Sequence, residues 1–351
     1  MKGSLKWVEI DLGAVRANLR AALRLAGPAK LLAVVKADGY GHGAAAVGRV
    51  ALEGGAHGLG VFTVEEALAL RKAGLRGRIV LLAPPLPEQA AEVVRARLEP
   101  SVDSLALADA LARRAGAAGL SVHVDLDYGL GRWGLAPKDL EPFLAALERR
   151  RRLRVAGLSA HLDYVPGRNA VEAEEKLRDF QRRCAGPKKR RPDLLRHAAN
   201  SSVLLDFPHW RMDMVRVGNL LYGINPTSKE AALRSPWSFR ARIIAVREVA
   251  KGQPIGYASE YLAPRRMRVA TLPVGYADGL TMEPAERLIR LGTGRRYWGL
   301  LRGEEVPFVG RCAISHVLVD LARVPNAKVG DVVVLPIRRT AASARLPRLY
   351  K

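Results

Sequence analysis

The 351-residue chain has little cysteine, few aromatic residues and no long apolar run, and each shortage excludes a class of protein. Two cysteines, Cys184 and Cys312, cannot build a disulfide framework or a multi-cysteine zinc site. No stretch of about 18 apolar residues runs without a charge, and the N-terminal segment lacks the apolar region of a signal peptide. We therefore expect a soluble, cytoplasmic protein without a membrane span and without a resident metal.

Acidic residues are also scarce, because 34 Asp and Glu face 57 Lys and Arg, which gives a formal net charge of +23. Basic residues gather at 149–154 and 182–191, where they could contact the phosphates of a nucleic acid. Aromatic residues make up only 6% of the chain, and no zinc-finger spacing or basic-region heptad accompanies the clusters. We expect the charge to lie on solvated outer faces, and we expect neither a nucleic-acid nor a membrane partner.

Up to about residue 228, short apolar runs alternate with stretches that repeat apolar residues every three or four positions. The second kind is typical of helices that cover a parallel sheet, as in 11–25, 64–72 and 105–114. Strands are predicted at 31–39, 56–62, 77–84, 97–102, 120–127, 155–162, 194–200 and 214–223. Eight such units predict an α/β fold of the (β/α)8, TIM-like barrel type.

Beyond residue 229 the pattern changes to strand-like runs separated by glycine and proline turns. The clearest runs are 239–249, 267–279, 304–321 and 330–337. We therefore expect a barrel over 11–228 and a C-terminal β-domain over 229–351. Residues 1–10 are expected to form an N-terminal strand that packs with the C-terminal domain.

Polar residues stand where the predicted barrel strands end, which is where barrel enzymes carry their chemistry. Lys36 directly follows the apolar run LLAVV, so that burial would lower the pKa of its amine and make it a nucleophile. A Schiff base with a sugar, a keto acid or pyridoxal phosphate (PLP) is the usual use of such a lysine. A salt bridge from Lys36 to Asp38, or to another acid in the barrel, is the plain structural alternative.

Several segments together resemble one family of PLP enzymes. Residues 33–43 (AVVKADGYGHG) closely resemble the cofactor-lysine motif of the alanine racemases, the barrel-type PLP enzymes. The later motifs follow in the family's order, and they are Asp127-Tyr-Gly-Leu-Gly-Arg132, Ala160-His161, His197-Ala-Ala-Asn-Ser201, Met214-Val-Arg216-Val-Gly218 and Pro273-Val-Gly-Tyr-Ala-Asp-Gly279. The resemblance spans nearly the whole chain and implies racemisation of L- and D-alanine, which supplies D-alanine for cell-wall peptidoglycan.

The resemblance also implies roles for individual residues. Lys36 would hold PLP and act on one face of the substrate Cα, and Tyr261 of the partner subunit would act on the other face. His161 and Arg216 would assist that tyrosine, with Arg216 beside the pyridine nitrogen. The cofactor phosphate would bind Tyr40, Ser201, Gly218 and Asn219, while Arg132 and Ile314 would contact the substrate carboxylate. A homodimer with shared active sites follows from these assignments.

The chain departs from the family at four positions. Ile314 and Ser315 replace the usual Met and Asp, and Ala344 replaces a tyrosine that binds phosphate. Asp125 stands where relatives carry a lysine, often carbamylated, and we expect its carboxylate to pair with Arg132 instead. These changes leave a broad amino-acid racemase, acting on serine or basic amino acids, as an alternative. A barrel-type PLP decarboxylase is a further alternative.

Overall fold

The computed structural model describes residues 3–280, 297–339 and 341–351, and it divides into two compact units. One unit is Leu12–Ser235, and the other joins Pro236–Lys351 to the segment that ends at Asp11. Residues 229–235 stay with the first unit because Asn18 binds the backbone of Arg234 in both directions. The Asn18 Nδ2 donates to the Arg234 carbonyl oxygen at 2.7 Å, and the Asn18 Oδ1 accepts from the Arg234 amide at 2.8 Å.

The first unit contains a sheet of eight parallel strands in the order β8-β7-β6-β5-β4-β3-β2-β9. The strands are β2 (Lys30–Val34), β3 (Gly58–Val61), β4 (Ile79–Leu81), β5 (Glu99–Val102), β6 (Leu120–Asp127), β7 (Leu153–His161), β8 (Leu195–His197) and β9 (Met214–Val217). The Arg216 amide donates to the Ala199 carbonyl at 2.9 Å, which brings β9 beside the end of β8. The nearly closed sheet confirms the predicted (β/α)8 barrel.

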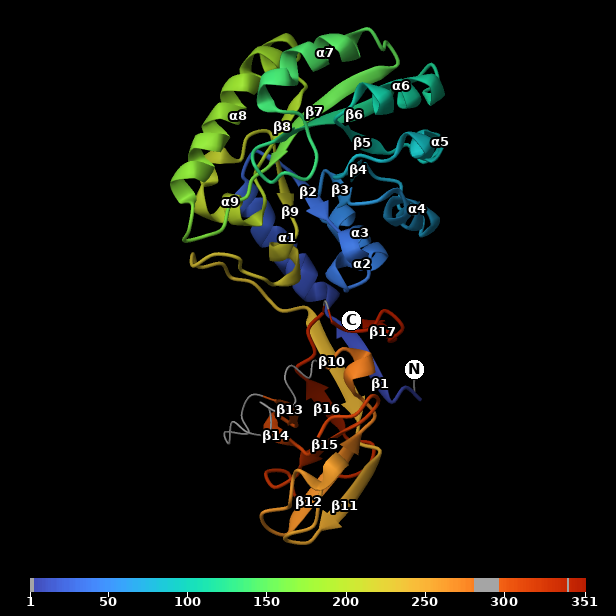
Figure 1. The fold of residues 1–351 in the computed structure, drawn as a ribbon, viewed down its shortest axis with the longest axis vertical. Coiled ribbons are helices and arrows are strands. Elements are labelled where there is room, and N and C mark those ends of the chain that lie inside the picture. Colours follow the sequence, from blue (N-terminus) through green and yellow to red (C-terminus); the bar gives the residue numbers. More distant parts are fainter. Residues whose placement is uncertain (1–2, 281–296, 340) are drawn as a thin grey trace. The chain divides into compact units, whose positions relative to one another are not determined.

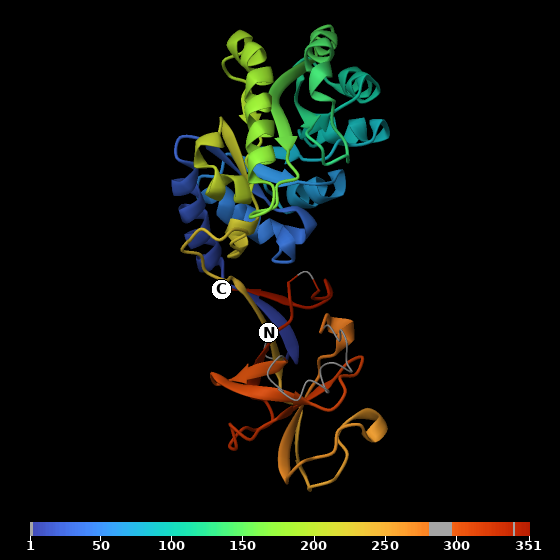
Figure 2. The ribbon, with the colours of Figure 1, turned by 60° about the vertical axis from the view of Figure 1, so that its left-hand side comes forward.

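Helices surround the strands of this unit (Figure 1; Figure 2). They are α1 (Leu12–Ala26), α3 (Ala44–Glu53), α4 (Val64–Lys72), α5 (Ala90–Arg95), α6 (Leu105–Arg114), α7 (Leu140–Glu148), α8 (Ala170–Arg190) and α9 (Ser201–Asp206). The bounds of α4 and α6 are those predicted, since their starts carry clear capping signals. Thr63 and Glu66 form a capping box at α4, and the Ser104 hydroxyl accepts from the Leu107 amide at α6.

The barrel interior changes from apolar to polar along its length. Leu32, Val80, Leu195 and Met214, from four different strands, pack as one buried cluster. Such a cluster is typical of the side-chain layers that fill a closed barrel. His123 and His197 are also fully buried in this unit, although their rings are polar. Buried polar side chains need partners, and the hydrogen bonds of these two residues are described below.

The second unit is a nine-stranded sheet in the order β11-β12-β15-β14-β13-β16-β10-β1-β17. Its strands are β1 (Lys6–Ile10), β10 (Trp237–Arg242), β11 (Ala245–Val249), β12 (Met267–Leu272), β13 (Trp298–Leu301), β14 (Glu304–Val309), β15 (Val317–Asp320), β16 (Val332–Leu335) and β17 (Arg348–Tyr350). The N-terminal strand β1 pairs antiparallel with β10 and parallel with β17. The runs 239–249 and 304–321 each divide into two strands, and the short strands β13 and β17 were not predicted.

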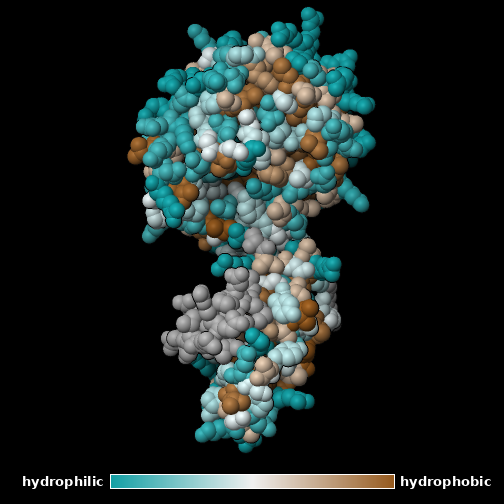
Figure 3. All heavy atoms as spheres, in the orientation of Figure 1, coloured by the Kyte–Doolittle hydropathy of each residue, from teal (hydrophilic) through white to brown (hydrophobic). Residues whose placement is uncertain are grey.

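Many cationic side chains of the two basic clusters are paired with carboxylates. The pairs are Arg150 with Asp109, Arg154 with Asp193, Arg182 and Arg183 with Asp179, Arg190 with Glu141, and Arg191 with Glu148. The face of the barrel unit in Figure 3 is largely hydrophilic. Such exposed pairs contribute little to stability, but they reduce the local positive field. None of the helices that the structure describes is long and apolar enough to cross a bilayer.

Candidate active site

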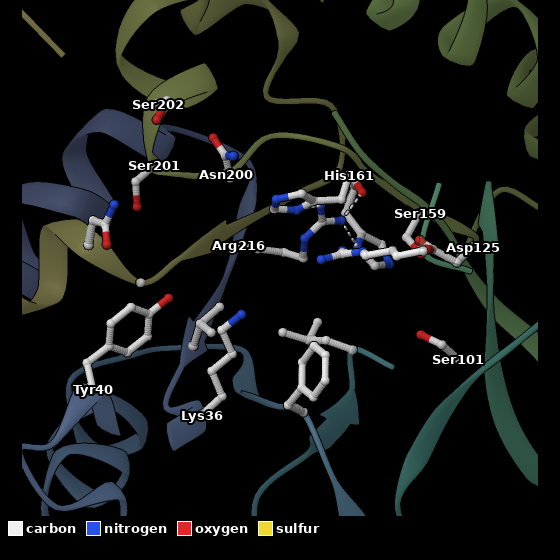
Figure 4. Close-up of a pocket in the computed structure, with 17 residues that line it drawn as sticks. Lys36, Tyr40, Ser101, Asp125, Ser159, His161, Asn200, Ser201, Ser202 and Arg216 are labelled. Carbon is white, nitrogen blue, oxygen red and sulfur yellow. Dashed lines mark hydrogen bonds between the residues drawn. The ribbon is translucent and has the colours of Figure 1, made fainter. Parts of the chain in front are cut away.

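A pocket lies in the barrel unit at the carboxyl ends of the strands (Figure 4). It is lined by all the predicted site residues of this unit, which are Lys36, Tyr40, Arg132, His161, Ser201, Arg216, Gly218 and Asn219. The lining also includes Val34, Phe62, Leu82, Ser101 and Ser159, which were not among the sequence-predicted site residues. Phe62 directly follows β3, so its place at a strand end could have indicated it. Ser101 and Ser159 lie inside strands, where the sequence gives no such signal.

Lys36 is presented by a tight left-handed turn, and the predicted strand over 31–39 is wrong beyond residue 34. The segment α2 (Lys36–Tyr40) has positive φ angles of 50° at Ala37, 52° at Asp38, 61° at Gly39 and 54° at Tyr40. Such angles cost about 1–2 kcal/mol per residue other than glycine, so the sequence pattern did not predict them. Backbone strain of this kind concentrates at functional sites.

Two carboxylates hold this strained turn. Glu66 accepts hydrogen bonds from the amides of Ala37 at 2.6 Å and of Phe62 at 2.7 Å, and thereby ties the turn to the end of β3. Asp38 accepts from the Ala44 amide at 3.0 Å, so it caps the start of α3.

The amine of Lys36 is partly buried, with an aromatic ring beside it and the positive charges of two arginines nearby. Its Nζ is 5.1 Å from the centre of the Phe62 ring. Burial lowers the pKa of Lys36, and the charges of Arg132 and Arg216 lower it further, whereas Glu66 raises it. A lysine of lowered pKa offers more neutral amine at physiological pH, which is the form that attacks a carbonyl.

One end of the pocket is built for a ligand with hydrogen-bond acceptors. The Ser201 side chain is buried, and its Oγ has no hydrogen-bond partner among the described residues. Gly218 leaves space for Tyr40, because a Cβ on this glycine would lie 2.6 Å from the Tyr40 hydroxyl oxygen. Asn219 begins the short 3-10 helix η4 (Asn219–Tyr222), so its amide is near the free donors of a helix start. A buried hydroxyl without a partner is costly unless a ligand supplies the partner.

Arg216 occupies the centre of the pocket lining and is 5% exposed. Its Nη1 donates to the His197 Nδ1 at 2.9 Å and to the His197 carbonyl, and its Nη2 donates to the Ala160 carbonyl at 2.6 Å. The Nη2 also lies 3.4 Å from the His161 Nδ1. Burial lowers the pKa of Arg216 to about 10, so the guanidinium remains protonated at neutral pH.

His161 is a neutral imidazole in this pocket. Burial and the positive charges of Arg216 and Arg132 lower the pKa of His161 to about 3. A neutral imidazole supplies no positive charge to a neighbouring phenol, so Arg216 is the permanent cation of this pair. The permanent positive charge of this pair therefore belongs to Arg216 and not to His161.

Arg132 is carried by a glycine loop that Asp127 organises. The Asp127 carboxylate accepts from the amides of Gly129 and Gly131, each at 3.1 Å, and of Leu130 at 3.0 Å. The guanidinium carbon of Arg132 stands 4.0 Å from the centre of the Trp133 ring. These contacts fix the loop and leave the guanidinium beside the pocket.

Asp125 is not in direct contact with Arg132, contrary to expectation. Its Oδ1 accepts from the Ser159 hydroxyl at 2.5 Å, and no Asp125–Arg132 ion pair occurs among the residues that the structure describes. Burial raises the pKa of Asp125, although the Ser159 hydrogen bond and the charges of Arg216 and Arg132 oppose that rise. The Asp125 carboxylate is thus hydrogen-bonded to the neighbouring strand β7 of its own sheet.

Two predicted site residues belong to the other unit. Tyr261 follows the 3-10 turn η5 (Tyr257–Ser259) and packs against a small cluster around Ile255 and Val269. Burial raises the pKa of Tyr261, and Asp320 raises it further. Ile314 is 56% exposed in the segment between β14 and β15. The residues that line the pocket all come from the first unit.

The fold and the pocket define a (β/α)8 barrel whose polar pocket, at the carboxyl ends of the strands, contains a lysine and two arginines. The chain matches the family domain described as alanine racemase, N-terminal domain, over residues 10–226, and alanine racemase, C-terminal domain, over residues 237–345. It is 38% identical to the alanine racemase of Desulfosudis oleivorans and 37% identical to that of Syntrophobacter fumaroxidans. Each alignment covers 94% of this chain, and 86% and 87% of the relatives.

Solved structures agree with this assignment. The alanine racemase of the D-cycloserine producer Streptomyces lavendulae has a TM-score of 0.85 at 31% identity and covers 99% of this chain and 97% of its own. The enzyme of Clostridium difficile 630 has a TM-score of 0.89, covers 99% and 96% of the two chains, and at 24% identity shows the fold alone. The chain belongs to the alanine racemase family, and it is an isomerase that interconverts L- and D-alanine.

Proposed function

We propose that the chain racemises alanine with pyridoxal 5'-phosphate as its resident cofactor and Lys36 as the residue that holds it. The observation that carries this proposal is the meeting of a lysine of lowered pKa, an unpartnered buried hydroxyl and a buried arginine in one pocket. When bound, PLP withdraws electron density from the substrate Cα and makes its C–H bond acidic. The residues below bind, orient and move protons around that atom.

The phosphate end of the cofactor would be held by Tyr40, Ser201 and the backbone amides of Gly218 and Asn219. The unpartnered Oγ of Ser201 and the space that Gly218 leaves for Tyr40 both fit this role. Phosphate oxygens would satisfy a hydroxyl that otherwise has no bond in the described part of the chain. Phosphate groups favour backbone amides and hydroxyls arranged in this way.

Arg216 would donate to the pyridine nitrogen. Its two terminal nitrogens are engaged with His197, Ala160 and His161, and among the described residues no group accepts from its Nε. Because the guanidinium remains charged, Arg216 could only donate to that nitrogen and could not protonate it. Arg216 would thereby limit the electron withdrawal that the cofactor supplies, and would favour return of the proton to the substrate Cα over transamination.

Two bases would face the substrate Cα from opposite sides. The Lys36 Nζ would take or return the proton on one face, and the hydroxyl of Tyr261 of the partner subunit would do so on the other. The raised pKa of Tyr261 in the isolated chain makes the phenol a poor base by itself, so it needs a cation nearby in the assembled site. Arg216 would supply that charge, with the neutral His161 positioned between the two groups.

The substrate carboxylate would bind Arg132, whose forked donors suit a carboxylate, and the backbone amide at Ile314 of the partner subunit. This arrangement requires a homodimer in which each barrel receives residues from the other protomer.

We place the enzyme in the cytoplasm, where it supplies D-alanine for peptidoglycan. The Ile314 and Ser315 departures favour serine or basic amino acids as additional substrates, and CO2 release without inversion would instead indicate a decarboxylase.

The cofactor assignment is tested by titrating the purified protein with PLP and recording absorbance. We expect a band at about 420 nm that is abolished by Lys36→Ala. Lys30→Ala is a matched control, because Lys30 begins the same strand β2 and is exposed at its other end. Loss of the band in both variants, or its absence in the wild-type protein, would contradict the proposal.

A further inference from the structure

A line of buried side chains leads from Arg216 through the barrel interior. The Arg216 Nη1 contacts the His197 Nδ1 at 2.9 Å, and the His197 Nε2 contacts the His123 Nδ1 at 2.9 Å. The His123 Nε2 then lies 3.1 Å from the Glu99 Oε2, which also accepts from the Arg78 Nη1 at 2.8 Å. His123 and His197 are 0% and 1% exposed, so water does not compete for these bonds.

The chemistry of the two ends fixes the direction of every bond in this line. A guanidinium can only donate, so the His197 Nδ1 must be the acceptor and the proton must be on its Nε2. That N–H donates to the His123 Nδ1, which places the His123 proton on its Nε2. The last N–H donates to the Glu99 carboxylate. Both histidines are therefore neutral Nε2–H tautomers.

The protonation states of His197 and Glu99 agree with hydrogen bonds that are donated from Arg216 toward Glu99. Burial lowers the pKa of His197 well below its ordinary value, and the charge of Arg216 lowers it further, so this imidazole is neutral. Burial raises the pKa of Glu99, but the hydrogen bond from His123 and the charge of Arg78 outweigh it and lower the pKa overall. Glu99 thus remains an ionised acceptor at the end of the line.

The backbone makes room for the two rings. Gly157 on β7 lies beside them, and a Cβ at this position would be 2.7 Å from the His123 Cε1 and 3.1 Å from the His197 Nε2. Any larger residue would displace the ring contact between the two histidines, whose centroids are 5.0 Å apart. Glycine at position 157 therefore leaves the space that the two histidine rings occupy.

We infer that Glu99 and His123 are positioning residues for Arg216, acting through the tautomer of His197. This inference rests on the proposed function, in which Arg216 contacts the cofactor ring. Without an acceptor at Glu99, His123 is free to carry its proton on Nδ1, where it faces the His197 N–H. The His197 proton would then be on its Nδ1, where this N–H and the Arg216 Nη1 would be two donors facing each other. The Arg216 Nη1 would lose its hydrogen bond to the His197 ring and keep only the bond to the His197 carbonyl, so the orientation of the Nε would be less well fixed.

The tautomers are tested by 15N NMR of the full-length protein labelled at its seven histidines, recorded before and after addition of PLP. Substitution of His123 and His197 one at a time assigns their signals. We expect both rings as Nε2–H tautomers without PLP. A proton on Nδ1 of either ring would overturn the inference. Because this spectrum needs no cofactor, it can fail or succeed independently of the proposed function.

Three variants then test the link to Arg216. Glu99→Met removes the acceptor, Glu99→Gln keeps an acceptor oxygen, and Arg78→Met removes only the outer partner of Glu99. We expect Glu99→Met alone to shift or average the His197 tautomer and to lower kcat about tenfold with KM nearly unchanged. Wild-type His197 signals and kcat in Glu99→Met would overturn the inference. If this variant does not fold, the wild-type tautomers still decide the question.

Discussion

Gly218 and Tyr40 lie so close that a Cβ added to the glycine would stand 2.6 Å from the tyrosine hydroxyl oxygen and 3.1 Å from its Cζ. The two residues come from opposite ends of the barrel sequence, after β9 and β2, which pair in parallel. The position of the tyrosine hydroxyl in the pocket therefore depends on the absence of a side chain at 218.

Gly218→Ala should displace Tyr40 and weaken PLP binding. Overpacking of this kind costs about 1–3 kcal/mol, which corresponds to roughly 5-fold to 150-fold weaker binding. The measurement is a PLP titration followed by absorbance. Gly116→Ala is the control, because a Cβ there would meet nothing within 4 Å. Equal PLP affinities in the two variants would contradict the proposed role of Tyr40.

Ser201→Ala should weaken PLP binding without lowering the unfolding free energy of the apoprotein. The Ser201 Oγ is buried without a partner in the described residues, so its removal should leave the unfolding free energy of the apoprotein unchanged or raise it by up to about 1 kcal/mol. The same variant should bind PLP more weakly, because the phosphate loses a donor. The apoprotein is measured by urea denaturation.

Ser101→Ala is the matched control for that experiment. The Ser101 hydroxyl donates to the Leu81 carbonyl at 2.8 Å in a buried position, so its loss should destabilise the apoprotein by about 1 kcal/mol. If Ser201→Ala is as destabilising as Ser101→Ala, the Ser201 hydroxyl has a structural partner and the phosphate assignment loses its support.

Asp125→Asn should stabilise the protein at neutral pH. A carboxyl whose pKa is raised by folding binds its proton more tightly in the folded state, so wild-type stability falls as pH rises above the ordinary value of 3.8. The asparagine side chain does not ionise, so the variant keeps its stability as pH rises. Its stability relative to the wild-type protein should therefore be greatest at neutral pH and should decrease as pH falls toward 3.8. Thermal unfolding across this pH range measures the effect.

The same variant also tests the substrate site. A less stable Asp125→Asn protein at neutral pH would show that the carboxylate is ionised and held by its cationic neighbours. If Asp125 nevertheless serves as an anionic partner of Arg132 through space, the KM for alanine should rise in Asp125→Asn. An unchanged KM would exclude that role.

Much of the barrel site could be predicted because it depends on local patterns. Apolar runs followed by polar residues marked the strand ends, and Lys36, His161 and Arg216 indeed line one pocket. The left-handed turn after Lys36 could not be predicted, since Ala37 and Asp38 rarely adopt positive φ angles. It is held by Glu66, a residue that the sequence places only at the start of a helix.

The line from Arg216 to Glu99 was also beyond the sequence pattern. His123 and Glu99 meet only because of the strand register, which pairs Ser101 with His123 across β5 and β6. No spacing within one segment encodes that contact. Tyr261 belongs to the other unit, and its proposed role in the pocket of a partner subunit rests on the family resemblance and not on a pattern within one segment.

Racemisation at sites shared between subunits is tested most directly by chiral chromatography of alanine after incubation with mixed variants. Lys36→Ala and Tyr261→Phe should each fail to convert L-alanine to D-alanine. Dissociated together and reassembled with PLP, they should recover about a quarter of the wild-type rate, because half of the random dimers are hybrids with one intact site of two. The wild-type protein should bring L- and D-alanine to equal amounts from either enantiomer. No D-alanine from the wild-type protein, or no recovery in the mixture, would contradict a racemase whose sites are shared between subunits.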